Sequence, residues 1–196
     1  MPDFSSTRRL AHAAVLAFGL ALSGASAASA QDLLSFFWSG GSRATVSFPS
    51  NVAPRQIIVS FGDRKLYWVY DQGAAISYPI AIPREQSRWS GVTSVSAKRV
   101  NPSWTPTAEM RRENPKLPVH VPGGHPLNPM GTRALYLGSS MYRIHGTDAP
   151  WTIGSAASKG CIRMYNEDAE DLYARVPTGT RVTVTWRKFE QYTSSW

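Results

Sequence analysis

Short apolar segments separated by turn residues are the feature that most constrains the fold of this chain. Residues 57–61 are followed by Gly62 and Asp63, and residues 66–70 by a second turn at 71–73 that leads into the apolar segment 74–82. Apolar segments of this length, bounded by Gly and Asp, are typical of strands joined in hairpins. Three such segments without a helical crossover predict an antiparallel meander.

The rest of the chain adds further strands and one clear helix. We expect a strand at 93–100, a hairpin of 132–137 and 142–145 around Gly138, and a last strand at 182–186, where apolar and polar residues alternate. Residues 166–176 predict a helix capped by Asn166, with acidic residues in its first turn and a buried stripe. The stripe comprises Ala169, Leu172, Tyr173 and Val176. These elements predict a mostly β domain with one or two short helices.

Residues 143–164 contain the candidate catalytic residues. They hold the single cysteine, Cys161, directly after Gly160 and sixteen positions beyond His145. A thiol acts as a nucleophile when a base takes its proton and backbone donors hold the charge that develops on the attacked carbonyl. The Gly160 and Cys161 amides are candidate donors, and the positive charges of Lys159 and Arg163 favour the thiolate.

Two other interpretations compete with a nucleophilic Cys161. A lone cysteine is often a small buried hydrophobe. A metal site could also be built from His120, His125, His145 and Cys161, but their spacing matches no zinc pattern. We therefore expect neither a metal nor a cofactor.

The spacing in this stretch closely resembles a known active-site signature. His145-Gly146-Thr147, a loop, and then Ser-Lys-Gly-Cys-Ile-Arg-Met at 158–164 are similar to the signature of the L,D-transpeptidase catalytic domain, the YkuD-like family of bacterial cell-wall enzymes. The resemblance extends from about residue 56 to 184 and implies a β-sandwich. Lys159 stands where many members of the family have histidine.

The resemblance implies a role for each site residue. Cys161 would be the nucleophile, His145 the general base and acid, and the Gly146 carbonyl the group that orients the imidazole. Gly160, with Ser158, Lys159 and Arg163, would form the oxyanion and substrate-binding residues. Arg163 would stabilise the site or meet a substrate carboxylate, and Lys159 would favour an acidic stem peptide.

The implied reaction is acyl transfer on peptidoglycan stem peptides. The thiolate would attack the bond before the terminal D-alanine of a tetrapeptide, and an amine would resolve the thioester. A second stem, the lysine of an envelope protein or water could be the acceptor, so an L,D-carboxypeptidase stays open. The alternatives of other classes are a non-catalytic wall-binding module and a metal-dependent peptidase, which a chelator would inhibit.

A long proline-rich connection spans residues 101–130. It lacks a hydrophobic period, and connections of this length in compact domains are usually functional or disordered. The resemblance implies that it is a loop covering the active site, flanked by Trp104 with Pro106 and by residues 128–131.

The amino-terminal region predicts export. Arg8 and Arg9 precede the apolar residues 10–22, and Ala28-Ser29-Ala30 is a small-residue cleavage site, so residues 1–30 predict a signal peptide and a periplasmic protein. An uncleaved anchor is the alternative, although the apolar run is short. Residues 31–54 are expected to be a tether, residues 55–187 the catalytic domain and residues 188–196 a tail. The apolar residues within 33–38 need a cover, which could be the domain, a partner or a membrane.

The charge of the exported chain limits its partners. Without the first 30 residues, 19 basic and 12 acidic side chains give a net charge of +7. In an exported protein this balance suits an anionic polymer or envelope, and we expect no nucleic acid as partner because no nucleic-acid motif is present. The single cysteine excludes an internal disulfide. We expect a monomer.

Overall fold

The computed structural model describes residues 41–192. Its elements, in chain order, are β1 (Ala44–Ser47), β2 (Gln56–Ser60), β3 (Lys65–Asp71), β4 (Ala74–Pro79), β5 (Ile82–Pro83), β6 (Gly91–Val100), α2 (Ala108–Glu113), β7 (Arg133–Leu137), β8 (Arg143–His145), β9 (Ala156–Ser158), β10 (Ile162–Arg163), α3 (Asn166–Arg175) and β11 (Arg181–Thr185). Single 3-10 turns lie at Glu85–Ser87, Pro150–Thr152 and Glu190–Tyr192. Strands therefore predominate among the described residues, as the sequence predicted.

Most of these strands belong to one mixed sheet. Its order is β1-β4-β3-β2-β11-β6-β7-β8-β10, and β5 pairs with β9 in a separate small sheet. The predicted meander is confirmed, since β2, β3 and β4 pair antiparallel in sequence order. The predicted hairpin of β7 and β8 is also confirmed.

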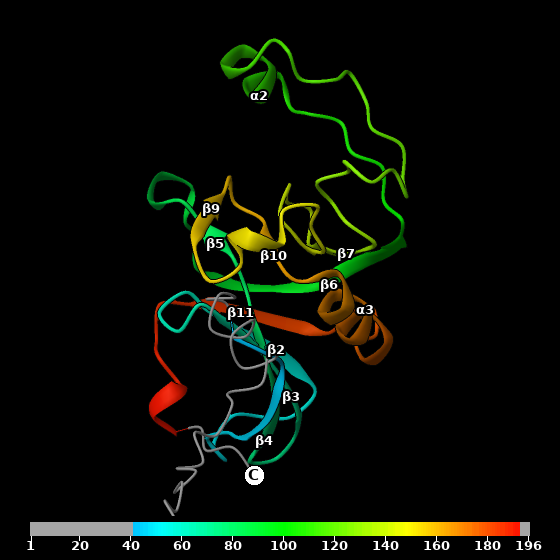
Figure 1. Cartoon of the computed structure of the whole chain (residues 1–196). Coiled ribbons are helices and arrows are strands. Elements are labelled where there is room, and N and C mark those ends of the chain that lie inside the picture. Colours follow the sequence, from blue (N-terminus) through cyan, green and yellow to red (C-terminus); the bar gives the residue numbers. More distant parts are fainter. Residues whose placement is uncertain (1–40, 193–196) are drawn as a thin grey trace, which may run out of the picture.

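The long strand β6 joins the two halves of this sheet. Its first residues, Gly91 to Ser94, pair with β11, and its later residues, from Val95 to Val100, pair with β7. The register shifts between Val95 and Ala97, where a bulge bends a strand and increases its twist. The part of the sheet with β2–β4 and β11 and the part with β7, β8 and β10 pack against each other around one core. This arrangement confirms the expected mostly β class (Figure 1).

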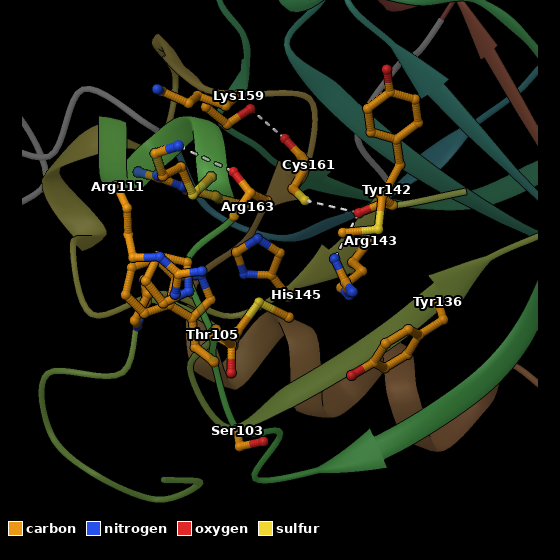
Figure 2. A pocket seen from close by; sticks show the side chains of 18 of the residues that line it. Ser103, Thr105, Arg111, Tyr136, Tyr142, Arg143, His145, Lys159, Cys161 and Arg163 are labelled. Carbon is orange, nitrogen blue, oxygen red and sulfur yellow. Dashed lines mark hydrogen bonds between the residues drawn. The ribbon is translucent and has the colours of Figure 1, made fainter. Parts of the chain in front are cut away.

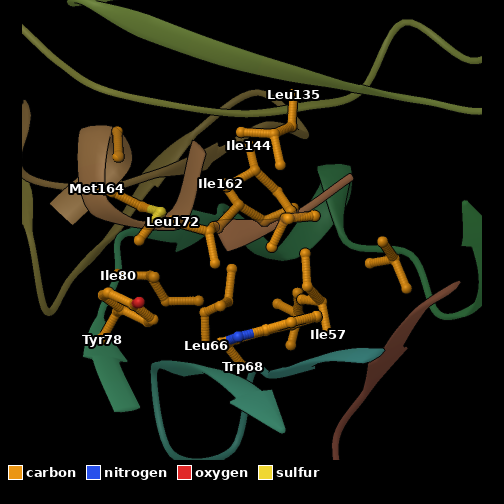
Figure 3. Packing of buried hydrophobic residues seen from close by; sticks show 14 of the residues in the cluster. Ile57, Leu66, Trp68, Tyr78, Ile80, Leu135, Ile144, Ile162, Met164 and Leu172 are labelled. Carbon is orange, nitrogen blue, oxygen red and sulfur yellow. The ribbon is translucent and has the colours of Figure 1, made fainter. Parts of the chain in front are cut away.

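The main core fills the space between the two halves. Figure 3 shows Ile57, Leu66 and Trp68 from one half facing Leu135, Ile144 and Ile162 from the other, with Leu172 of α3 beside them. A second, smaller cluster covers the opposite face of β2–β4 and contains Val46, Phe48, Ile58, Tyr67, Val69, Ala75 and Phe189. Strands buried on both faces need apolar residues at consecutive positions, which explains the near-continuous apolar runs at 57–61 and 66–69.

The two ends of the described chain complete the second cluster. Residues 44–47, within the expected tether, form β1 beside β4, and Phe48 is buried. Phe189, within the expected tail, stacks on Phe48 with ring centroids 5.1 Å apart. The predicted signal peptide and the apolar residues at 33–38 lie outside the described residues. Between residues 41 and 192, no helix is long and apolar enough to cross a membrane.

Helix α3 packs as predicted but begins differently. Ala169, Leu172 and Val176 are fully buried, whereas Tyr173 lies at the margin of the core. The predicted cap by Asn166 is wrong, because Tyr165 occupies the N-cap position and no side chain caps the helix. The Asn166 side chain instead bonds the backbone of two loops, which provide three hydrogen bonds.

The long connection forms an arm, defined here as residues 101–131, that projects from the sheet and carries α2 (Figure 1). Trp104 and Val121 exchange two backbone hydrogen bonds of 2.9 and 2.8 Å across it. The Asn128 amide donates to the carbonyls of Pro102 and Pro122, at 2.8 and 3.0 Å. The base of the arm is therefore cross-linked by hydrogen bonds.

Truncating Leu172 tests the core. Leu172→Ala should lower the free energy of unfolding by about 2–5 kcal/mol, because the side chain is fully buried and the variant leaves a cavity. Chemical denaturation measures this change. Leu127→Ala is the matched control, since Leu127 is 71% exposed and its truncation should cost less than about 0.5 kcal/mol. Equal losses in the two variants would contradict this packing.

Candidate active site

The pairing of β8 with β10 brings the two predicted reactive residues onto one face of the sheet. The strands are parallel, with Ile144 opposite Ile162 and His145 opposite Arg163. Both isoleucines are fully buried in the core. Because side chains alternate along strands, His145 and Cys161 point to the other face, and Cys161 is the diagonal neighbour of His145.

This face forms one wall of a pocket of about 580 Å³. The arm supplies the opposite wall, so segments distant in the sequence meet around Cys161 and His145 (Figure 2). The lining residues of the arm include Trp104, Thr105, Pro106, Thr107, Met110 and Arg111. The expected loop over the candidate site is thus present, and both of its predicted flanks, Trp104 with Pro106 and residues 129–130, line the pocket.

His145 is held in one tautomer by its neighbour. Its Nδ1 lies 2.5 Å from the Gly146 carbonyl oxygen, which can only accept, so Nδ1 carries the proton and Nε2 keeps a free lone pair. The pKa of His145 is lowered from 6.5 to about 4, mainly because the ring is buried; the hydrogen bond to Gly146 opposes this shift, and the charges of Arg163 and Arg143 add to it. The imidazole is therefore neutral at pH 7 and able to accept a proton.

Cys161 is half-buried, and its sulfur lies 3.9 Å from the Met141 carbonyl oxygen. Burial raises the pKa of the thiol above its usual 9.0, whereas the amide and guanidinium of Arg143 and the charge of Arg163 lower it. At pH 7 the thiol is protonated beside a neutral imidazole. A base must remove the proton when the sulfur reacts, and Nε2 of His145 has the right charge state for that task.

An aromatic pair fixes the backbone at Gly160. Trp89 and Tyr142 stack with ring centroids 4.7 Å apart, and Trp89 Nε1 donates to the Gly160 carbonyl at 3.0 Å. Gly160 has φ +117°, and a side chain there would collide with the Tyr142 ring. Since the C=O and N–H of one peptide point in opposite directions, the bond to Trp89 turns the Cys161 amide away from Trp89.

Ser158 also fixes the cysteine. Its hydroxyl is buried and donates to the Cys161 carbonyl at 2.5 Å. The sequence predicted Ser158 as a site residue but gave no indication that Trp89 and Tyr142 contribute to the site. No local pattern identifies Trp89, because it lies 71 residues from the carbonyl to which it donates.

Lys159 lines the pocket but is directed away from the sulfur. It forms an ion pair with Glu113, the last residue of α2, and Figure 2 shows its side chain extending away from Cys161. The cations that act on the thiol are Arg143 and Arg163. Among residues 41–192, four cationic side chains nevertheless line the pocket and no Asp or Glu does; the four are Arg111, Arg143, Lys159 and Arg163.

The alternative metal site is not assembled. His120 bonds the Thr105 hydroxyl at 3.0 Å, and His125 accepts from the Leu127 amide at 3.1 Å. Neither histidine lines the pocket that contains His145 and Cys161. Within residues 41–192, no three His, Cys, Asp or Glu side chains are placed to share a metal ion.

Comparison with known proteins shows to which protein family the chain belongs. The family model of the L,D-transpeptidase catalytic domain, YkuD, matches residues 54–184, so this chain belongs to that family. A curated relative from Escherichia coli, named "Probable L,D-transpeptidase ErfK/SrfK", is 43% identical over 136 residues, which are 65% of this chain and 43% of the relative. The Escherichia coli relative named "Probable L,D-transpeptidase YbiS" is 42% identical over 134 residues, with 64% and 43% covered. The match therefore spans less than half the length of these relatives.

Solved structures share the fold. The catalytic domain of the Enterococcus faecium L,D-transpeptidase acylated by ertapenem aligns with a TM-score of 0.52 and 19% identity, covering 68% of this chain and 98% of that domain. An L,D-transpeptidase from Mycobacterium smegmatis aligns with a TM-score of 0.52 and 16% identity, covering 66% and 58%. The expected β-sandwich of the L,D-transpeptidase type is thus confirmed as a mixed-sheet fold.

Alkylation of Cys161 tests the electrostatics of the thiol. The rate with iodoacetamide should rise continuously into the alkaline range, because burial raises the pKa of the thiol and the neutral imidazole offers it no ion pair. Arg143→Ala should slow alkylation at a given pH by roughly threefold or more, because it removes a cation that stabilises the thiolate.

Two variants control for this effect. Arg143→Lys should retain most of the wild-type rate because it keeps the positive charge. Lys159→Ala should shift the pH profile less than Arg143→Ala, since Lys159 is paired with Glu113. A larger shift with Lys159→Ala than with Arg143→Ala would show instead that Lys159 is the cation that tunes the sulfur, as its position in the sequence suggested.

Proposed function

We propose that this domain is a cysteine-dependent L,D-transpeptidase that acts on peptidoglycan stem peptides. The observation that carries the proposal is the β8–β10 register, which places Cys161 and His145 on one wall of the pocket. Membership of the L,D-transpeptidase family and relatives of that name support it. Structures of the same fold supply further support.

The first half-reaction forms a thioester. Nε2 of His145 takes the Cys161 proton while the sulfur attacks the carbonyl carbon before the terminal D-alanine of a tetrapeptide stem. The amides of Gly160 and Cys161 donate to the oxyanion of the tetrahedral intermediate. When the C–N bond breaks, imidazolium returns the proton to the departing D-alanine amine, and the acyl group stays on the sulfur.

The second half-reaction releases the enzyme. An acceptor amine attacks the thioester carbonyl, and His145 takes a proton from that amine. The C–S bond then breaks, and the imidazolium returns the proton to the sulfur, which leaves as the thiol. The acceptor is a side-chain amine of a second stem, giving a cross-link, or a protein lysine, giving an anchored envelope protein. Water in the same position would make the domain an L,D-carboxypeptidase.

The charge of the pocket suits an acidic peptide. Arg143 and Arg163 act on the sulfur, Arg111 adds positive charge from the arm, and no acidic side chain of residues 41–192 lines the cavity. Because stem peptides carry carboxylates, ion pairs with these side chains would orient them. Peptidoglycan lies outside the cytoplasm, so the proposal includes export, and residues 1–30 have the pattern of the signal peptide that this needs.

Incubation with a disaccharide-tetrapeptide tests the activity. The mature protein should release D-alanine, and intact-mass spectrometry should detect an acyl adduct on Cys161. A carbapenem should give a stable adduct on the same sulfur, since its strained amide carbonyl can be attacked in the same way and a related domain is acylated by ertapenem. Cys161→Ser is the control and should accumulate neither adduct.

Folded protein that binds stem peptides yet gives no adduct and no D-alanine would support a non-catalytic wall-binding module instead. Loss of activity with a chelator would support a metal-dependent peptidase.

Substitution of single histidines tests the base. His145→Ala should reduce carbapenem acylation by about 10²–10⁴-fold, because no other group would take the thiol proton. His120→Ala and His125→Ala should retain most of the rate, since both histidines bond within the arm and neither lines the pocket. Acylation rates from stopped-flow spectroscopy measure the difference. Similar losses in all three variants would contradict the role of His145.

A further inference from the structure

We propose that Asn166 is a positioning residue for the general base, acting through the peptide that links Gly146 to Thr147. This inference rests on the proposed function, because it assumes that His145 moves the Cys161 proton. It assigns a task to a side chain that contacts neither the sulfur nor the imidazole. Asn166 is the first residue of α3 and does not line the pocket.

The Asn166 amide makes three hydrogen bonds to backbone groups. Its Oδ1 accepts from the amide of Thr147 at 3.1 Å and from the amide of Thr132 at 3.2 Å. Its Nδ2 donates to the Thr147 carbonyl at 3.1 Å. Amide nitrogens can only donate, so the oxygen of the side chain must face them and its orientation is determined.

One of these bonds acts on the group that holds the imidazole. The Thr147 amide and the Gly146 carbonyl belong to the same planar peptide, and its N–H and C=O point in opposite directions. When Asn166 Oδ1 holds the N–H, the carbonyl is directed to the other side, where His145 Nδ1 donates to it at 2.5 Å. Rotation of this peptide would remove the acceptor that fixes the tautomer of His145.

The surrounding backbone is shaped to admit Asn166. A side chain at Gly146 would collide with Asn166 Oδ1, and one at Gly131 would collide with the same oxygen and with the Gly146–Thr147 peptide. Gly131 also has φ +62°, a conformation that disfavours other residues. Two glycines are thus needed for one amide to reach both loops, which an ordinary helix cap would not require.

The neighbouring peptide is fixed by the sheet. Met164 donates to the His145 carbonyl at 2.8 Å, and Gly146 donates to the Arg133 carbonyl at 3.1 Å. These bonds hold the backbone on one side of the Gly146 α-carbon, and Asn166 holds it on the other. Asn166 therefore holds the Gly146–Thr147 peptide, which lies beyond the last backbone hydrogen bonds of the sheet.

The test compares three variants of the mature protein. Asn166→Ala removes all three bonds, whereas Asn166→Asp keeps the acceptor for both amides and loses only the donation to Thr147. Ser60→Ala is the matched control, because the buried Ser60 hydroxyl bonds two backbone groups, of Arg187 and Asp63, and contacts no residue of the site. Thermal unfolding of each variant reports how much stability is lost.

The first readout needs no substrate. In ¹⁵N NMR spectra, His145 of the wild type should give a protonated Nδ1 with a slowly exchanging proton. Asn166→Ala should broaden or lose that signal. Asn166→Asp should retain it, because the carboxylate still accepts from the Thr147 amide. Ser60→Ala should leave it unchanged. An unchanged Nδ1–H signal in Asn166→Ala would overturn the inference.

The second readout is catalysis. Asn166→Ala should lower the first-order rate of carbapenem acylation by roughly 10- to 100-fold with little change in the concentration needed for half-saturation, because the pocket lining is intact while proton transfer is misaligned. Asn166→Asp should recover most of that rate. Equal losses in Asn166→Ala and Ser60→Ala, at equal loss of stability, would reduce Asn166 to a structural residue. If the wild type shows no acylation, the proposed function fails, yet the NMR comparison still decides whether Asn166 fixes His145.

Discussion

The parallel pairing of β8 with β10 is the constraint on which the candidate site depends. It buries Ile144 and Ile162 on one face and thereby leaves His145 and Cys161 on the other. A shift by one residue would exchange the two faces, placing the imidazole in the core and an isoleucine in the pocket. The core residues therefore specify the site, because only one register satisfies both faces.

Burial determines the charge state of the two reactive groups. It lowers the pKa of His145 to about 4 and raises that of Cys161, so the pair rests as neutral imidazole and neutral thiol. An exposed pair would resemble free histidine and cysteine. In the proposed reaction, charge would separate between Cys161 and His145 only when a substrate carbonyl is within reach of the sulfur. The proposed donors at Gly160 and Cys161 would then meet negative charge that forms only during the reaction.

Supporting groups around the pair come from distant segments. Trp89 and Tyr142 hold the backbone at Gly160, and Asn166 holds the peptide after Gly146. The arm adds the opposite wall, and Glu113 of α2 pairs with Lys159, which lines the cavity. The contacts are hydrogen bonds, an ion pair and a ring stack between residues that are not neighbours in the chain. Such contacts hold reactive groups in place more rigidly than a loop alone could.

Local patterns in the sequence were sufficient to predict the strands of the meander, the β7–β8 hairpin and most of the buried stripe of α3, and they supplied His145 and Cys161, with their glycine neighbours, as the candidate pair. Hydrophobic alternation and turn residues reflect interactions between residues close in the chain, and the motif at 158–164 is continuous. Both can therefore be recognised in the sequence alone.

Only the tertiary structure decided three other features. Strand β11 lies between β2 and β6, Phe48 and Phe189 are buried, and the Asn166 side chain bonds two loops instead of capping the helix. The same holds for the direction of Lys159 towards Glu113 and for the contact of Trp89 with Gly160. In each case the partner is a backbone or side-chain group whose distance in the chain carries no local signal. The physical reason is that a polar side chain bonds whichever group the packed core brings within reach, and only the assembled core determines that group.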